Sequence, residues 1–132
     1  MDADRQKHLA IILAREFASR LSTPTLIADA RGHLVFYNEA AEAVLGRHFS
    51  EDGEIPLDDW VAAFEPRTAS SEPVALERRP ARIAFDERRA SHLRYLVTGA
   101  DGVEREIEST AFPLFARTDE FVGIAVIWWR RQ

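Results

Sequence analysis

The sequence contains no cysteine among its 132 residues. Disulfide bonds, thiolate metal ligands and cysteine nucleophiles all need a cysteine sulfur, so each of these is excluded. The same absence excludes any cofactor that must form a covalent bond with a cysteine side chain. Whole classes of enzyme and redox sensor are therefore ruled out by composition.

Long apolar runs are missing as well. The longest one, Phe121–Trp129, is about half of the roughly 20 residues that a membrane-spanning helix requires. The chain starts with the acidic segment Met1-Asp2-Ala3-Asp4, whereas a secretory signal starts with a basic one. We therefore expect a cytoplasmic protein that has no membrane partner.

Positive charge is scarcer than negative charge. The 17 lysine and arginine residues are outnumbered by 22 aspartate and glutamate residues, which gives a net charge of −5. This balance gives no general attraction to nucleic acid or to an anionic membrane, so neither is expected as a partner. The charges are segregated, because residues 50–72 are rich in carboxylates and residues 76–94 are rich in arginine. Two such patches can meet within one molecule or between two.

At 132 residues the chain has the length of one domain. We divide it into a flanking helix at 1–22 and a domain at 23–132. At helical periodicity one apolar stripe of the flanking helix is expected to pack on the core, and it consists of Ala10, Leu13, Ala14, Phe17 and Leu21. Leu9 and Ile12 fall among the polar residues, either as ordinary exposed side chains or as contacts with a second subunit.

The remaining chain alternates between strand and helix patterns. Two short strands at 25–30 and 33–37 form a predicted hairpin, and Asn38 is expected to cap a helix at 39–45 that Gly46 ends. Further along, the patterns predict helical segments at 57–64 and 81–90 and strands at 91–98, 103–114 and 121–130.

The last predicted strand is apolar on both of its alternating faces. A strand of this kind is buried on both sides, so we expect it at the centre of the sheet. One face would cover the core, and the other would be covered by the N-terminal helix, by a partner's sheet or by both. Residues of this strand and of the flanking helix form the candidate interface: Leu9, Ile12, Leu13, Phe17, Ile127 and Trp129.

Two ordered motifs carry a resemblance to a known family. The first, residues 27–46, is a strand, a glycine turn, a second strand and a short helix that opens with Asn38. The second, residues 100–114, is an Ala-Asp-Gly turn that leads into a long strand, and Gly123 follows in the apolar last strand. In this order and spacing, over roughly residues 22–130, the sequence resembles a PAS domain, the sensory module of bacterial signalling proteins.

The resemblance implies an α+β fold, with a five-stranded antiparallel sheet in the spatial order 2-1-5-4-3 and helices on one face. Some members of the family hold a small molecule or cofactor between the sheet and the helices. Many dimerise through an N-terminal helix like residues 2–22. The implied function is a sensory signalling domain that forms a homodimer and relays a change through protein contacts, including contacts with a separate effector protein.

The family's cofactors can be compared with the residues present. Light-sensing members form a flavin–cysteinyl adduct, which a chain without cysteine cannot form. Haem-binding members usually ligate iron through a histidine on the helix before the third strand, and residues 81–90 contain none, so haem is not expected; His92 lies just beyond. A noncovalent flavin or another small organic ligand stays open. The candidate pocket residues are Trp60, Phe85, Tyr95, Arg94, Phe112 and Trp128, although the same aromatic side chains would also serve to fill a core.

Catalytic motifs are absent from the sequence. It has no nucleophile elbow, phosphate-binding loop or zinc-binding helix, and its four histidines lack metal-ligand spacing, so we predict a protein that is not an enzyme and has no metal site. A small cup-shaped enzyme would use Asp29, His33, Tyr37 and Tyr95, but Asp29 is more simply explained as a turn residue. The main alternative to a sensor is a structural dimerisation module whose core is filled by its own side chains.

Overall fold

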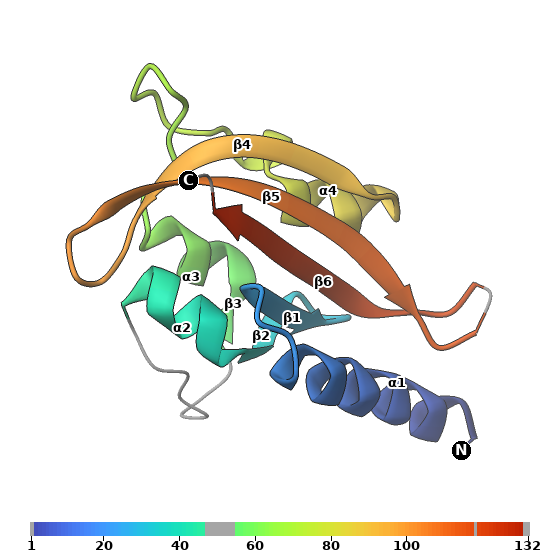
Figure 1. Ribbon diagram of the computed structural model, residues 1–132. Coiled ribbons are helices and arrows are strands. Elements are labelled where there is room, and N and C mark those ends of the chain that lie inside the picture. The colour runs from blue at the N-terminus through green and yellow to red at the C-terminus, as the bar shows by residue number, and fades with distance from the viewer. Residues whose placement is uncertain (1, 47–54, 118, 131–132) are drawn as a thin grey trace.

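The computed structural model describes residues 2–46, 55–117 and 119–130 (Figure 1). A curved antiparallel sheet forms the centre of the molecule, with short helices on one face and the N-terminal helix on the other. Along the chain the elements are α1 (Asp2–Ser19), β1 (Thr25–Asp29), β2 (His33–Tyr37), α2 (Glu39–Leu45), β3 (Ile55–Pro56), α3 (Leu57–Ala62), the 3-10 turn η1 (Leu76–Arg78), α4 (Pro80–Glu87), β4 (Ser91–Thr98), β5 (Glu104–Phe115) and β6 (Phe121–Arg130).

The strands lie in the order β3-β2-β1-β6-β5-β4. This confirms the predicted order of five strands and adds β3, a two-residue strand beside β2 that the sequence pattern did not reveal. The last strand, β6, is central as predicted, because it pairs with β1 on one side and β5 on the other. Ala125, for example, lies opposite Ile27 of β1 and Phe112 of β5.

The first hairpin and the helix after it follow from local hydrogen bonds. The Asp29 side chain accepts a hydrogen bond from the backbone N–H of Arg31 at 2.9 Å and another from that of His33 at 3.1 Å. Asn38 caps α2 by accepting a hydrogen bond from the N–H of Ala41 at 3.0 Å. Both side chains therefore act as the sequence predicts for a turn residue and an N-cap.

Asp101 holds the turn between β4 and β5. Its Oδ1 accepts a hydrogen bond from the N–H of Val103 at 3.0 Å, and its Oδ2 pairs with the Arg105 guanidinium at 2.9 Å. Arg105, with help from the Val103 amide, lowers the pKa of the Asp101 carboxyl from 3.8 to about 2. The turn carboxylate is therefore ionised throughout the neutral pH range.

The main core lies between the sheet and the helices α2, α3 and α4. Aromatic rings fill its centre: the ring centroid of Trp60 is 5.1 Å from that of Tyr37, 4.7 Å from that of Phe64 and 6.5 Å from that of Trp128. Trp128 is 1% exposed and is the largest of the fully buried side chains among the described residues. The core is therefore built around a cluster of large rings that come from β2, from α3 and the turn after it, and from β6.

The flanking helix packs on the opposite face of the sheet through a different stripe from the predicted one. Ile11, Ala14 and Ala18 contact the sheet, whereas Leu13 is 58% exposed and Phe17 is 66% exposed. The expectation that Leu13 and Phe17 belong to the core was therefore wrong. The small side chains of Ala14 and Ala18 let the helix backbone approach the sheet closely. Helix α1 is therefore rotated about its axis relative to the prediction, and Leu13 and Phe17 lie beside the contact instead of beneath it.

Candidate functional site

Two places in the structure are candidate sites: the interior between sheet and helices, and the surface beside α1. In the interior, Trp60, Tyr95 and Trp128 are all buried, and each is at most 5% exposed. The space that remains near Tyr95 and Trp128 is a void of about 10 Å³. Pockets for small organic ligands are usually of the order of 300–1,000 Å³, so this void has no room for such a ligand.

The other candidate pocket residues lie elsewhere. Phe85 is half-buried at the edge of the core, where its ring meets that of Phe121 at 5.5 Å, and it lines a separate cleft of about 120 Å³. Phe112 lies on the outer face of the sheet, against the cluster around α1. Arg94 is exposed and pairs with Glu108 at 3.5 Å. The six candidates are therefore distributed over both faces of the sheet and do not converge on one cavity.

A small polar group is nevertheless buried in the core. Burial raises the pKa of the Tyr95 phenol, and the neighbouring Ser109 hydroxyl, Arg79 and Trp128 partly oppose that shift. Ser109 and Trp128 lie opposite each other on β5 and β6. Ser109 Oγ and Trp128 Nε1 are buried and lie close enough to the Tyr95 hydroxyl to lower its pKa, but neither forms a hydrogen bond of normal distance and angle with a described residue.

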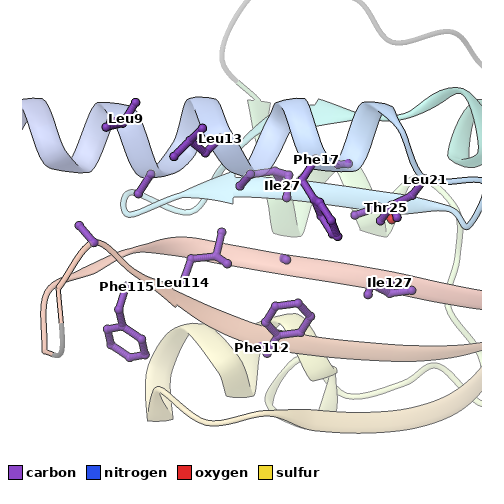
Figure 2. Close-up of a pocket in the computed structure, with 15 residues that line it drawn as sticks. Leu9, Leu13, Phe17, Leu21, Thr25, Ile27, Phe112, Leu114, Phe115 and Ile127 are labelled. Atoms are coloured by element: carbon purple, nitrogen blue, oxygen red, sulfur yellow. The ribbon is translucent and has the colours of Figure 1, made fainter.

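The surface beside α1 carries a wide apolar groove of about 580 Å³. One side of it is formed by α1 and the other by the outer face of the sheet, as Figure 2 shows. Among the lining side chains, Leu9, Leu13 and Phe17 come from α1, and Phe112, Leu114 and Ile127 come from β5 and β6. We call this the α1 groove, and its lining includes no charged side chain.

A second depression lies on the other flank of α1. It encloses about 480 Å³, and its lining includes Ile12, Arg15, Asp29 and Val35. Helix α1 therefore forms a ridge between two hollows, of which only the α1 groove is free of charged side chains.

The six candidate interface residues divide accordingly. Leu9, Leu13 and Phe17 project into the α1 groove from the helix, and Ile127 lines it from the sheet. Ile12 faces the second depression. Trp129 is 46% exposed near the end of β6 and lines neither hollow.

A single buried side chain ties α1 to the domain. Asn38 donates from Nδ2 to the carbonyl oxygens of Ala18 and Thr23, both at 2.9 Å, and it accepts at Oδ1 from the N–H of Thr25 at 3.0 Å. The same Oδ1 caps α2. The sequence predicted the cap alone, because the contact with α1 depends on how residues 20 positions apart come together.

His92, the histidine considered as a haem ligand, lies on the protein surface. His92 is exposed, and its Nδ1 lies 2.7 Å from Thr110 Oγ1 on the surface of β4 and β5. Within the described ranges no group of three histidine, aspartate or glutamate side chains is arranged to hold a metal ion. Those ranges also contain no helix with the length and apolarity needed to cross a membrane.

Comparison with known proteins identifies the fold. No protein-family model and no curated protein sequence matches the chain. Among solved structures it is similar to the PAS domain of a protein from Colwellia psychrerythraea, with 14% identity over 91% of this chain and 97% of that one, at a TM-score of 0.63. The PAS domain of BvgS from Bordetella pertussis has 16% identity over 92% and 84% of the two chains, at a TM-score of 0.60.

A LOV protein from Rhodobacter sphaeroides is also similar, with 11% identity over 100% of this chain and 69% of that one, at a TM-score of 0.67. At such identities the likeness concerns the fold alone. The chain therefore has a PAS fold, which confirms the resemblance in the sequence and the α+β class derived from it.

Proposed function

We propose that this chain is a sensory signalling module of the PAS type that works through protein contacts and forms a homodimer through the α1 groove. The observation that carries the proposal is the groove itself. Three large apolar side chains of α1, Leu9, Leu13 and Phe17, are each more than half exposed beside an apolar sheet surface. A contiguous apolar patch of this kind on a protein surface marks an interaction site.

The energetics favour a second copy as the occupant. Full burial of one such side chain contributes roughly 1.5–3 kcal/mol. In a twofold-symmetric dimer the same patch is used by both subunits, so each side chain contributes twice. The lining is also free of charged side chains, as in the centres of stable interfaces. The α1 ridge of one subunit would fill the groove of the other.

The filled interior supports protein contact as the mode of action. The void near Tyr95 and Trp128, about 10 Å³, would not accept flavin, haem or another organic cofactor without displacing core rings. We therefore favour a signalling module that acts through its dimer interface over one that senses an organic ligand held in its core. A change at the dimer interface would pass to a separate effector protein through α1, which Asn38 links to both β1 and α2.

Light scattering of the purified chain after size-exclusion chromatography tests the proposal. We expect the unaltered chain to have the mass of a dimer and the double variant Leu13→Glu/Phe17→Glu to have that of a monomer, because charges would have to be buried in the groove. Leu76→Glu is the matched control, since Leu76 is also exposed but lies on η1, outside the groove, so this variant should stay dimeric.

Three results would contradict the proposal. They are a monomeric parent chain, a double variant that remains a dimer, and an organic ligand bound in one-to-one ratio in native mass spectrometry of the same sample. Circular dichroism of each variant establishes that the fold is kept. Both altered side chains are exposed, so the core packing does not depend on them.

A further inference from the structure

The void in the core is small, and polar side chains are part of its lining. It lies between α3, α4 and the sheet, and its lining includes Leu57, Val61, Tyr95, Ser109 and Trp128. A volume of about 10 Å³ corresponds to roughly one water molecule. A void of this size lined only by apolar side chains would stay dry. This void is also lined by side chains with polar groups, namely Tyr95, Ser109 and Trp128.

Three side chains with polar ends meet there from three neighbouring strands. Tyr95 comes from β4, Ser109 from β5 and Trp128 from β6, and Ser109 lies opposite Trp128 in the ladder. Ser109 and Trp128 are each 1% exposed, and Ser109 Oγ and Trp128 Nε1 lack hydrogen-bond partners among the described residues. Buried polar atoms in folded proteins are bonded in the large majority of cases, because an unsatisfied one costs its full desolvation energy.

We propose that this void is a binding site for one water molecule, held by Trp128 Nε1, Ser109 Oγ and the Tyr95 hydroxyl. The indole N–H can only donate, so the bound molecule must accept a hydrogen bond from it. The two hydroxyl groups can donate or accept, which matches the remaining capacity of water. An organic molecule does not fit the volume, and the indole N–H, which can only donate, does not suit a cation.

The void adjoins a second space that lies closer to the surface. Leu57, Asp58 and Ala81 line both the void and the neighbouring cleft of about 120 Å³. Asp58 pairs with Arg82 of the cleft at 2.9 Å, so an ion pair joins α3 to α4 beside the two spaces. The water would exchange through this contact, and it would fasten β4, β5 and β6 together at the centre of the core. This inference does not depend on self-association.

A crystal structure at a resolution that shows ordered water tests the site directly. We expect one water peak in the void, within hydrogen-bond distance of Trp128 Nε1 and Ser109 Oγ. An empty void, or a direct hydrogen bond of Trp128 Nε1 to Ser109 Oγ or to the Tyr95 hydroxyl, would overturn the proposal.

Thermal unfolding of Ser109→Ala supplies a second test. The sign of the change in the unfolding midpoint distinguishes a Ser109 hydroxyl that binds water from one that is unsatisfied. If Ser109 Oγ binds water, its removal should lower the unfolding midpoint by about 3 °C relative to Ser91→Ala. Ser91→Ala is the matched control, because it makes the same change on the adjacent strand β4, opposite Ala111. If Ser109 Oγ is unsatisfied, its removal relieves a penalty, and an equal or higher midpoint than that of the control also overturns the proposal.

Discussion

At the scale of single residues, Asn38 joins more parts of the fold than any sequence motif suggests. Its side chain is 1% exposed and connects the end of α1, the start of β1 and the first turn of α2. The oxygen and the nitrogen of the side-chain amide form hydrogen bonds with different parts of the chain. The oxygen accepts from two backbone N–H groups, and the nitrogen donates to carbonyl oxygens at the end of α1 and in the segment after it.

Two substitutions at Asn38 distinguish the hydrogen bonds that its oxygen accepts from those that its nitrogen donates. Asn38→Ala loses both and should lower the free energy of unfolding by roughly 2–4 kcal/mol, because a cap and buried backbone partners are lost. Asn38→Asp keeps the acceptor but sets a carboxylate against the carbonyl oxygens of Ala18 and Thr23. We therefore expect it to leave α2 protected and to release α1, as measured by amide hydrogen exchange. Equal protection of α1 in Asn38→Asp and in the parent chain would contradict this role; Glu39→Gln, on the exposed neighbour, is the control.

At the scale of elements, the approach of β6 to β1 depends on a glycine. A Cβ atom at Gly123 would lie 2.1 Å from the carbonyl oxygen of Ala28, far inside contact distance. The Gly102 backbone, in the β4–β5 turn, also has a positive φ, of +78°, but an added Cβ there would meet no atom within 4 Å. Comparing alanine substitutions at the two glycines therefore distinguishes the loss of stability caused by crowding between strands from the loss caused by backbone conformation alone.

Alanine substitution at each glycine tests this distinction by urea denaturation. Gly102→Ala should cost about 1–2 kcal/mol, the penalty for a side chain in the left-handed region. Gly123→Ala should cost roughly 3 kcal/mol or more, because β1 and β6 must move apart and ladder hydrogen bonds are lost. Equal losses at the two sites would show that the β1–β6 contact has more freedom than the structure indicates.

At the scale of the whole molecule, the two faces of the sheet have different tasks. One face is closed by α2, α3 and α4 over a core in which the void beside Trp128 measures about 10 Å³. The other is covered in part by α1, whose narrow contact through Ile11, Ala14 and Ala18 leaves the α1 groove beside it. The first face provides stability, and we infer that the second provides the contact with another subunit.

Self-association of this kind makes stability depend on protein concentration. Because a dimer must dissociate when its chains unfold, the midpoint of thermal unfolding should rise by about 2 °C for each tenfold increase in protein concentration. Calorimetry over a hundredfold range would measure this, and Leu13→Glu/Phe17→Glu should show no such rise. A parent chain whose midpoint is independent of concentration would contradict the dimer.

Much of the fold can be predicted from local patterns. The Asp29 turn, the Asn38 cap and the central position of β6 all depend on residues near one another in sequence, or on the two-residue periodicity of one strand. Two features escaped this kind of prediction. The strand β3 has only two residues and therefore no periodicity. The stripe of α1 that meets the sheet was predicted from helical periodicity, which does not show how closely the helix approaches the sheet.

The sequence by itself determined the central position of β6 and the exclusion of cysteine chemistry, because these follow from residue identity and periodicity along the chain. Its resemblance to PAS domains implied the class of fold and the order of the strands. Only the tertiary structure decided how α1 is rotated, how little space remains beside Trp128, and that Phe112 and Trp60 lie on opposite faces of the sheet. Those outcomes depend on volumes and distances between side chains far apart in sequence. An apolar pattern shows that a side chain prefers burial, but its neighbours in space decide what covers it.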